Sequence, residues 1–215
     1  SELGTRSYWE QAYKNELSNF ADHGDMGEVW FGRKNECRVI RWMLLHAAKT
    51  SRIVDIGCGN GHLLVHLAKE GFTDLTGVDY VENAVILAKE VAAKEAVSIL
   101  FEVGDILEQN PPCPCFSRKY DFALDKGTYD AISLCPDNPQ EKRIRYLEAV
   151  SQILAPGGRF VIVSCNWTQQ ELTQHFEREL VLVDAIPTPT FLFGGSQGKS
   201  VTALVFGLKS SMEVS

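Results

Sequence analysis

Residues 54–61 decide the fold, and they are Val54-Asp55-Ile56-Gly57-Cys58-Gly59-Asn60-Gly61. An apolar run that ends in a turn of three glycines is typical of a β-strand leading into the N-terminus of a helix. Glycines in such a turn adopt positive φ and let a ligand approach the backbone, because no Cβ stands in the way. The free N–H groups of the following helix attract polar ligands. Taken alone, the stretch predicts a site for a nucleotide-like ligand.

The chain after this turn alternates short β-branched runs with helical periodicities. The pattern predicts strands at residues 52–56, 75–79, 98–103, 120–125, 159–164, 180–185 and 201–207, and helices at 61–70, 82–95, 139–154 and 168–178. Such alternation implies right-handed crossovers and an α/β fold with a mostly parallel sheet and helices on both faces. The last two strands have no helix between them, so we expect them to pair antiparallel. The turn-rich stretch 110–118 is predicted to be a surface loop.

The first 50 residues are predicted to be helical. Apolar and aromatic residues recur at helical spacing in 9–20 and again in 40–47, and a loop with several glycines, residues 24–32, separates the two. We expect residues 1–50 to form a helical lid segment packed on a core of residues 51–209. One structural domain is predicted in all.

The composition is that of an ordinary globular protein. Of its 215 residues 45% are hydrophobic and 23% are charged, which excludes wholesale disorder. The net charge of −7 would on average repel a bare duplex or an anionic membrane, so we expect neither as a partner. No apolar run is long enough to span a bilayer, and the first residues lack a secretory signal pattern. We expect a cytoplasmic monomer with reduced cysteines, and nuclear entry stays open.

Two acids end the next two predicted strands. Asp79, followed by Tyr80, stands at the interval after the glycines at which an acid accepts from two ribose hydroxyls. Asp105 stands where an adenine amino group would donate to it, with Ile106 covering the ring. The Gly-x-Gly-x-Gly spacing differs from the Gly-x-Gly-x-x-Gly of dinucleotide sites, which disfavours a nucleotide-dependent dehydrogenase. The pattern favours a nucleoside ligand, although either acid alone could be a helix cap.

These motifs, with the turn Leu154-Ala155-Pro156-Gly157-Gly158, resemble those of the class I S-adenosylmethionine-dependent methyltransferases. The resemblance covers about residues 50–208. It implies a single Rossmann-like fold with seven strands in the order 3-2-1-4-5-7-6, strand 7 being antiparallel. It also implies S-adenosyl-L-methionine as methyl donor and S-adenosyl-L-homocysteine as product. The expected cofactor-binding residues of the core are Asp55, Gly57, Gly59, Gly61, Asp79, Tyr80, Asp105 and Ile106.

A narrower resemblance spans almost the whole chain. It is carried by Gly24-Asp25-Met26-Gly27-Glu28-Val29-Trp30-Phe31-Gly32, Asp125-Lys126-Gly127-Thr128-Tyr129-Asp130-Ala131-Ile132, Ser164-Cys165-Asn166-Trp167-Thr168 and Phe193-Gly194-Gly195. These segments are similar to the elongation factor 1-alpha lysine methyltransferases of the methyltransferase-like protein 10 type. Met26 and Cys58 depart from the residues usual there, without threatening the backbone geometry. The resemblance implies that the protein substrate is elongation factor 1-alpha, methylated on one lysine.

Methyl transfer to lysine needs an in-line approach and a deprotonated amine. Ligands of open α/β sheets bind beyond the carboxyl ends of the strands, where Asp125 and Trp167 are expected. We predict that Asp125 orients the amine and contacts the cofactor, and that Tyr129 and Trp167 help to form an aromatic channel. Alternatively, Asp125 caps the next segment and both aromatics pack on the sheet. Trp9 and Trp30 are predicted to fold over the cofactor, although the helical spacing of Trp9 also fits a core position.

No metal is expected. His62 and His66 lie four residues apart on a predicted helix, and Cys113 and Cys115 lie in a loop, but neither pair has further ligands at useful spacing. Two other functions stay open at this point. One is a methyltransferase of the same fold acting on a small molecule or another protein residue, and the other is a non-catalytic cofactor-binding module.

Overall fold

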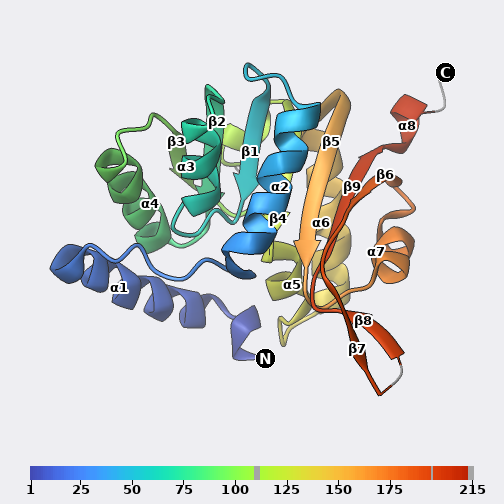
Figure 1. Cartoon of the computed structure of the whole chain (residues 1–215), viewed down its shortest axis with the longest axis horizontal. Coiled ribbons are helices and arrows are strands. Elements are labelled where there is room, and N and C mark those ends of the chain that lie inside the picture. Colours follow the sequence, from blue (N-terminus) through green and yellow to red (C-terminus); the bar gives the residue numbers. More distant parts are fainter. Residues whose placement is uncertain (109–111, 195, 213–215) are drawn as a thin grey trace.

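A seven-stranded sheet runs through the centre of the molecule (Figure 1). Its strands are β1 (Arg52–Ile56), β2 (Asp74–Asp79), β3 (Leu100–Val103), β4 (Tyr120–Lys126), β5 (Leu154–Ser164), β6 (Leu180–Ile186) and β9 (Thr202–Leu208). They lie in the order β3-β2-β1-β4-β5-β9-β6, with β9 antiparallel to both of its neighbours and the others parallel. Because β9 is the seventh predicted strand, the mostly parallel sheet and its expected order are confirmed. The computed structural model describes residues 1–108, 112–194 and 196–212.

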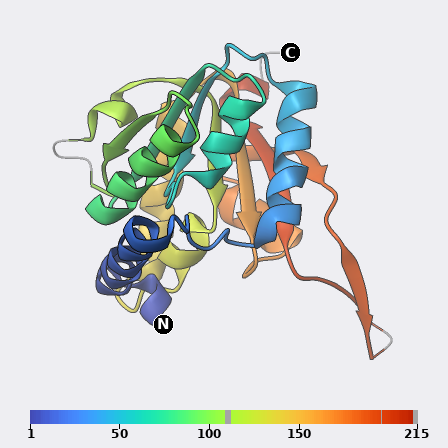
Figure 2. The same cartoon turned by 60° about the vertical axis from the view of Figure 1, so that its left-hand side comes forward.

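Helices cover both faces of the sheet (Figure 2). On one face lie α2 (Gly32–His46), α3 (His62–Lys69) and α4 (Glu82–Lys94), and on the other lie α5 (Thr128–Ser133), α6 (Pro139–Ile153) and α7 (Gln169–Phe176). Successive residues of a strand point to opposite faces. Ile53 of β1 therefore belongs to the core under α2 to α4, while Val54 and Ile56 belong to the core under α6 and α7.

The N-terminal segment is helical, as predicted. After a short 3-10 turn, η1 (Glu2–Gly4), helix α1 (Arg6–His23) packs beside α4 and lies across the end of the sheet to which β1 and β5 point (Figures 1 and 2). Helix α2 contributes buried Val39, Ile40 and Met43 to the same core as α3 and α4. In the described ranges, every helix falls short of the length or the apolarity that a membrane-spanning helix requires.

Several details differ from the sequence prediction. Strand β5 begins at Leu154, so the predicted turn lies within it, next to a register shift opposite β4. Helix α5 was not predicted, nor was the small hairpin of β7 (Thr190–Phe193) and β8 (Ser196–Lys199) between β6 and β9. The predicted surface loop 110–118 contains a 3-10 turn, η2 (Pro114–Ser117), whose Cys115 is buried. Its first residues, 110 and 111, and Gly195 lie outside the described residues. The described part of the chain ends with the short α8 (Lys209–Met212).

Candidate functional site

A cavity of about 600 Å³ opens at the carboxyl ends of β1 to β5. Parallel strands bring these ends to one edge, where open α/β sheets bind their ligands. Nine of the sequence-predicted site residues line this cavity: Trp9, Trp30, Asp55, Gly57, Gly59, Asp79, Tyr80, Asp105 and Ile106. The fold therefore brings most of the predicted cofactor residues together in one place.

The glycine turn between β1 and α3 follows the geometry expected of it. Gly57, Gly59 and Gly61 have φ of 71°, 54° and 75°. A Cβ on Gly59 would lie 2.5 Å from the Tyr13 hydroxyl oxygen, so a side chain there would collide with α1. Gly61 does not line the cavity, because it caps α3 and faces the ring of Phe101.

The two acids beyond the turn are held by backbone N–H groups. Asp79 accepts from the N–H of Gly59 and of Val81, both at 3.0 Å. Burial raises the pKa of Asp79 to about 6, and these hydrogen bonds limit the rise, so the group is ionised at neutral pH. Asp105 Oδ1 accepts from Leu107 N at 2.9 Å. Both carboxylates keep acceptor capacity toward the cavity, which fits the hydroxyl and amino donors of a nucleoside.

Asp55 contributes a different kind of acid to the cavity wall. Its side chain is 3% exposed, and its Oδ1 has no hydrogen-bond partner. Burial raises the pKa of Asp55 to about 8, against the opposing charge of Lys126. An unpartnered buried acceptor at the end of β1 is costly unless a ligand donates to it. This observation supports a polar or cationic ligand group next to the glycine turn.

Asp125 does not line the cavity. Its carboxylate accepts from the N–H of Thr128 (2.8 Å) and of Tyr129 (3.0 Å) and from the hydroxyl of Tyr146. Burial raises the pKa of Asp125 to about 7, although these hydrogen bonds counter the rise. Both oxygens are thus engaged in holding the first turn of α5. This geometry favours the capping alternative, and a direct contact of Asp125 with amine or cofactor stays a prediction.

The predicted channel aromatics also lie behind the cavity wall. Tyr129 is 1% exposed, packs against Tyr146 and Phe176, and forms a hydrogen bond with His175 at 3.0 Å. Trp167 packs edge to face on His175, and its Nε1 donates to Ser133 Oγ at 3.2 Å. Neither lines the cavity, so their role as channel residues stays a prediction too.

The wall at the ends of β4 and β5 is formed by other residues. Lys126, Thr128, Asp130 and Asn166 line it, and so does Glu28 from the loop before α2. The two oxygens of Asp130 accept from Ser164 Oγ (2.5 Å) and Cys165 N (2.8 Å). The sequence pattern predicted a site here through Asp125, but Lys126 and Glu28 were not among the predicted site residues. The proximity of Glu28 to Trp30, a predicted site residue, was the available signal.

The N-terminal aromatics meet over the cavity. The rings of Trp9 and Trp30 lie 5.0 Å apart, and Trp9 Nε1 donates to Leu3 O at 2.8 Å. Tyr13, the next aromatic of α1, reaches the glycine turn. Trp9 therefore belongs both to the packing of α1 and to the cavity wall. The sequence pattern alone had left these two positions open for Trp9.

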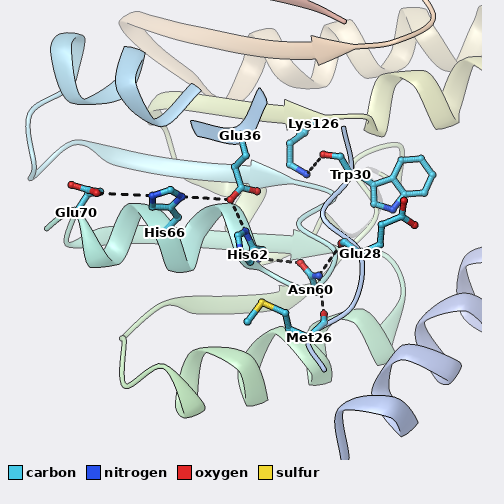
Figure 3. Close-up of polar contacts among 9 residues, drawn as sticks. All are labelled: Met26, Glu28, Trp30, Glu36, Asn60, His62, His66, Glu70 and Lys126. Carbon is cyan, nitrogen blue, oxygen red and sulfur yellow. Dashed lines mark hydrogen bonds and ion pairs between the residues drawn. The ribbon is translucent and has the colours of Figure 1, made fainter. Parts of the chain in front are cut away.

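The histidine pair meets an acid that the sequence did not connect with it (Figure 3). Nδ1 of His62 and of His66 lie 2.5 and 3.6 Å from Glu36 Oε1, and Glu36 is 1% exposed. Burial raises the pKa of Glu36, but the His62 hydrogen bond and the neighbouring cations outweigh it and hold the pKa below its usual value. The contact links the first turns of α2 to α3.

Within the described part of the chain, one cluster has donor atoms close enough to share a metal ion: Glu102, Cys113 and Cys115. Glu102 also pairs with Arg118 at 3.3 Å. A zinc site ordinarily has four ligands, and this cluster offers three. The absence of a metal stays a prediction.

Known proteins resemble this chain along its length. The family described as a methyltransferase domain matches residues 47–204. EEF1A lysine methyltransferase 2 of Danio rerio is 45% identical over 96% of this chain and 88% of its own. Protein-lysine N-methyltransferase EFM4 of Saccharomyces cerevisiae is 36% identical over 96% of this chain and 94% of its own.

The solved structures agree on the fold. The N-methyltransferase NodS of Bradyrhizobium japonicum, in complex with S-adenosyl-L-homocysteine, superposes with a TM-score of 0.66 at 18% identity, covering 92% of this chain and 97% of that one. The family match covers most of the chain, and the two relatives match it over nearly its full length. The chain belongs to the EEF1A lysine methyltransferase 2 family of methyltransferases.

Proposed function

We propose that this protein transfers methyl groups from S-adenosylmethionine to a lysine of translation elongation factor 1-alpha. The observation that carries the proposal is the match to EEF1A lysine methyltransferase 2, which covers 96% of this chain and 88% of that protein. A match over nearly all of both chains includes the N-terminal segment that borders the cavity. The shared region is therefore larger than the cofactor-binding core.

The cavity has two ends that fit the two reactants. The ends of β2 and β3 supply Asp79 and Asp105 for the hydroxyl and amino groups of an adenosyl moiety. We name this the nucleoside end. The ends of β4 and β5, with Glu28 and Trp30, leave room for the methyl acceptor, and we name this the acceptor end. The glycine turn lies between them, beside the unpartnered Oδ1 of Asp55.

The chemistry requires positioning more than covalent participation. When bound, S-adenosylmethionine supplies an electrophilic methyl group on a sulfonium. The residues of this chain would have to hold the lysine nitrogen in line with that methyl group, and the nitrogen must first lose a proton. At pH 7 the free amine costs roughly 4.6 kcal/mol. Enclosure by Trp30 and its neighbours lowers this cost by disfavouring the ammonium.

We infer that Asp125, Tyr129 and Trp167 act on the acceptor through other residues. Asp125 holds the first turn of α5, which presents Thr128 and Asp130 to the cavity. Trp167 is tied to the end of α5 through Ser133. In this proposal the three are positioning residues, and the groups next to the amine are Glu28 and Asn166.

The test uses the purified protein with recombinant elongation factor 1-alpha and S-adenosylmethionine carrying a labelled methyl group. We expect label in the factor, on a single lysine when its peptides are sequenced by mass spectrometry. Label on a small molecule or on another residue type would show that the proposed substrate is wrong. Tight binding of S-adenosylhomocysteine without any turnover would make the protein a non-catalytic module.

We further infer a monomer that needs neither metal nor nucleic acid and that acts in the cytoplasm, with entry into the nucleus open. The support is the −7 net charge, which disfavours nucleic acid as a partner. Light scattering on the purified protein measures the mass directly, and full activity in excess chelator is the expected result for the metal.

A further inference from the structure

The loop before α2 is fastened to the glycine turn by one side chain. Asn60 Nδ2 donates to the carbonyl oxygens of Met26 (2.9 Å) and Glu28 (3.1 Å), and Asn60 Oδ1 accepts from His62 N (3.1 Å) (Figure 3). Asn60 is 7% exposed. Both of its donors are spent on the loop, so this residue of the glycine motif connects the N-terminal segment to the cofactor site.

Lys126 fastens the same loop from β4. Its Nζ donates to the carbonyl oxygen of Trp30 at 3.0 Å (Figure 3). Burial lowers the pKa of Lys126, while the charges of Glu36, Asp55 and Asp125 oppose that shift. An ammonium in a largely enclosed place is costly unless polar groups surround it. Here the Trp30 carbonyl oxygen accepts from Lys126, and the charges of these acids favour its ammonium form. The lysine is therefore held in place rather than free to extend into solvent.

These contacts decide what the loop presents to the cavity. Figure 3 shows the side chains of Glu28 and Trp30 on the same side of the segment, and both line the cavity. The ring of Phe31 packs over Gly127, where an added Cβ would lie 3.2 Å away. The segment thus borders the acceptor end, between the glycine turn and β4. Within the described residues, the Glu28 carboxylate takes no hydrogen bond or ion pair of its own.

We propose that Asn60 and Lys126 are positioning residues of the reaction. They hold the backbone of Met26–Trp30 so that Glu28 and Trp30 form a fixed wall of the acceptor end, an aromatic face beside a carboxylate that suits the side chain of a lysine. The inference rests on the proposed function for its substrate. For Lys126 it requires no change in cofactor affinity, because the contact of Lys126 with Trp30 lies at the acceptor end.

The experiment compares Lys126→Met, Lys126→Arg and Asn60→Asp with the wild type. Met keeps the length of the lysine stem and removes the donor and the charge. Arg keeps both. Asp at position 60 keeps the acceptor for His62 N and replaces the two donors with an oxygen that repels the loop carbonyls. Lys49→Met is the matched control, because Lys49 also donates to a backbone carbonyl, that of Glu70, outside the cavity wall.

Hydrogen exchange is measured first, without substrate, on peptides that cover residues 24–32. In Lys126→Met and Asn60→Asp we expect exchange there to rise about tenfold, because loss of a hydrogen bond to a charged or buried partner costs enough to open the segment. Lys126→Arg and Lys49→Met should exchange like the wild type. Steady-state kinetics should then show KM for elongation factor 1-alpha raised about tenfold in Lys126→Met and Asn60→Asp, with the S-adenosylhomocysteine Kd of Lys126→Met within roughly threefold of wild type.

The outcomes separate the inference from the proposed function. If hydrogen exchange is unchanged in both Lys126→Met and Asn60→Asp, these residues do not hold the backbone of Met26–Trp30. If exchange is faster but KM is unchanged, the segment has no role in positioning the substrate. If Lys126→Met does not fold, Asn60→Asp decides. A wild-type protein that leaves elongation factor 1-alpha unmodified refutes the proposed substrate, while the exchange result still decides whether these contacts hold the segment.

Discussion

The nucleoside end and the acceptor end of the cavity are built in different ways. At the nucleoside end the acids lie at or just beyond the ends of their strands. Asp79 and Asp105 each accept from the N–H two residues further along the chain, and Asp79 also accepts from Gly59 in the turn after the neighbouring β1. At the acceptor end Lys126 meets Trp30 across 96 residues of sequence, and Asn60 meets Glu28 across 32. The first end depends on local turns and strand order, and the second depends on the packing of the whole domain.

The largest effect is expected at the acceptor end, from Asp125→Ala. The change leaves the N–H groups of Thr128 and Tyr129 and the Tyr146 hydroxyl without their acceptor, which should lower the free energy of unfolding by about 3 kcal/mol or more. Denaturant titration measures it. Asp121→Ala, at the exposed start of the same strand, is the control. It removes one acceptor, that of the Arg52 N–H, and should cost far less. Unchanged stability with lost turnover would instead mean that Asp125 acts on the acceptor directly.

At the nucleoside end, Asp79→Asn should weaken S-adenosylhomocysteine roughly 100-fold, because charge-assisted hydrogen bonds to two hydroxyls are lost together. Isothermal titration calorimetry gives the affinity. Asp74→Asn, at the opposite, partly exposed end of β2, should leave it unchanged. If Asp79→Asn binds S-adenosylhomocysteine within threefold of the wild type, Asp79 does not bind the ribose hydroxyls.

The protonation of Asp79 sharpens the same point. Its folded pKa of about 6 lies above the usual value because of burial, so the carboxylate is lost as the pH falls through 6. If only the carboxylate binds the hydroxyls, S-adenosylhomocysteine should bind about tenfold more weakly at pH 5 than at pH 7. The free energy of unfolding has the opposite pH dependence. The folded state takes up the proton more readily, so this group favours folding at low pH and that contribution is lost as the pH rises from about 4 to about 6. Asp79→Asn should abolish the pH dependence of binding.

The smallest effect concerns Glu28. Glu28→Gln keeps the shape and removes the charge, so KM for elongation factor 1-alpha should rise about fivefold, in line with one exposed charged contact. The S-adenosylhomocysteine affinity should not change. Glu90→Gln, on the exposed side of α4, is the control. A Glu28→Gln enzyme with the wild-type KM would place the incoming lysine elsewhere on the wall.

The difference between the two ends also explains what could be predicted. The seven strands and the residues of the nucleoside end were foreseen, because strand–turn–helix motifs place them through local geometry. The six-residue helix α5 is too short to show periodicity, so the sequence left Asp125 open between capping and contact with the amine, and it did not reveal Tyr146 as a partner. The approach of Glu28 and Trp30 to β4 depends on Asn60 and Lys126, and no spacing in the sequence reveals such a contact.

Strand β1 has a consequence for the way the protein unfolds. Ile53 packs into one core, and Val54 and Ile56 pack into the other. Unfolding of either core therefore displaces β1 and removes side chains from the other core. The two halves of the domain are therefore thermodynamically coupled through a five-residue strand. The tryptophan fluorescence, to which Trp42 of one core contributes, and the circular dichroism of the whole chain should follow a single cooperative transition.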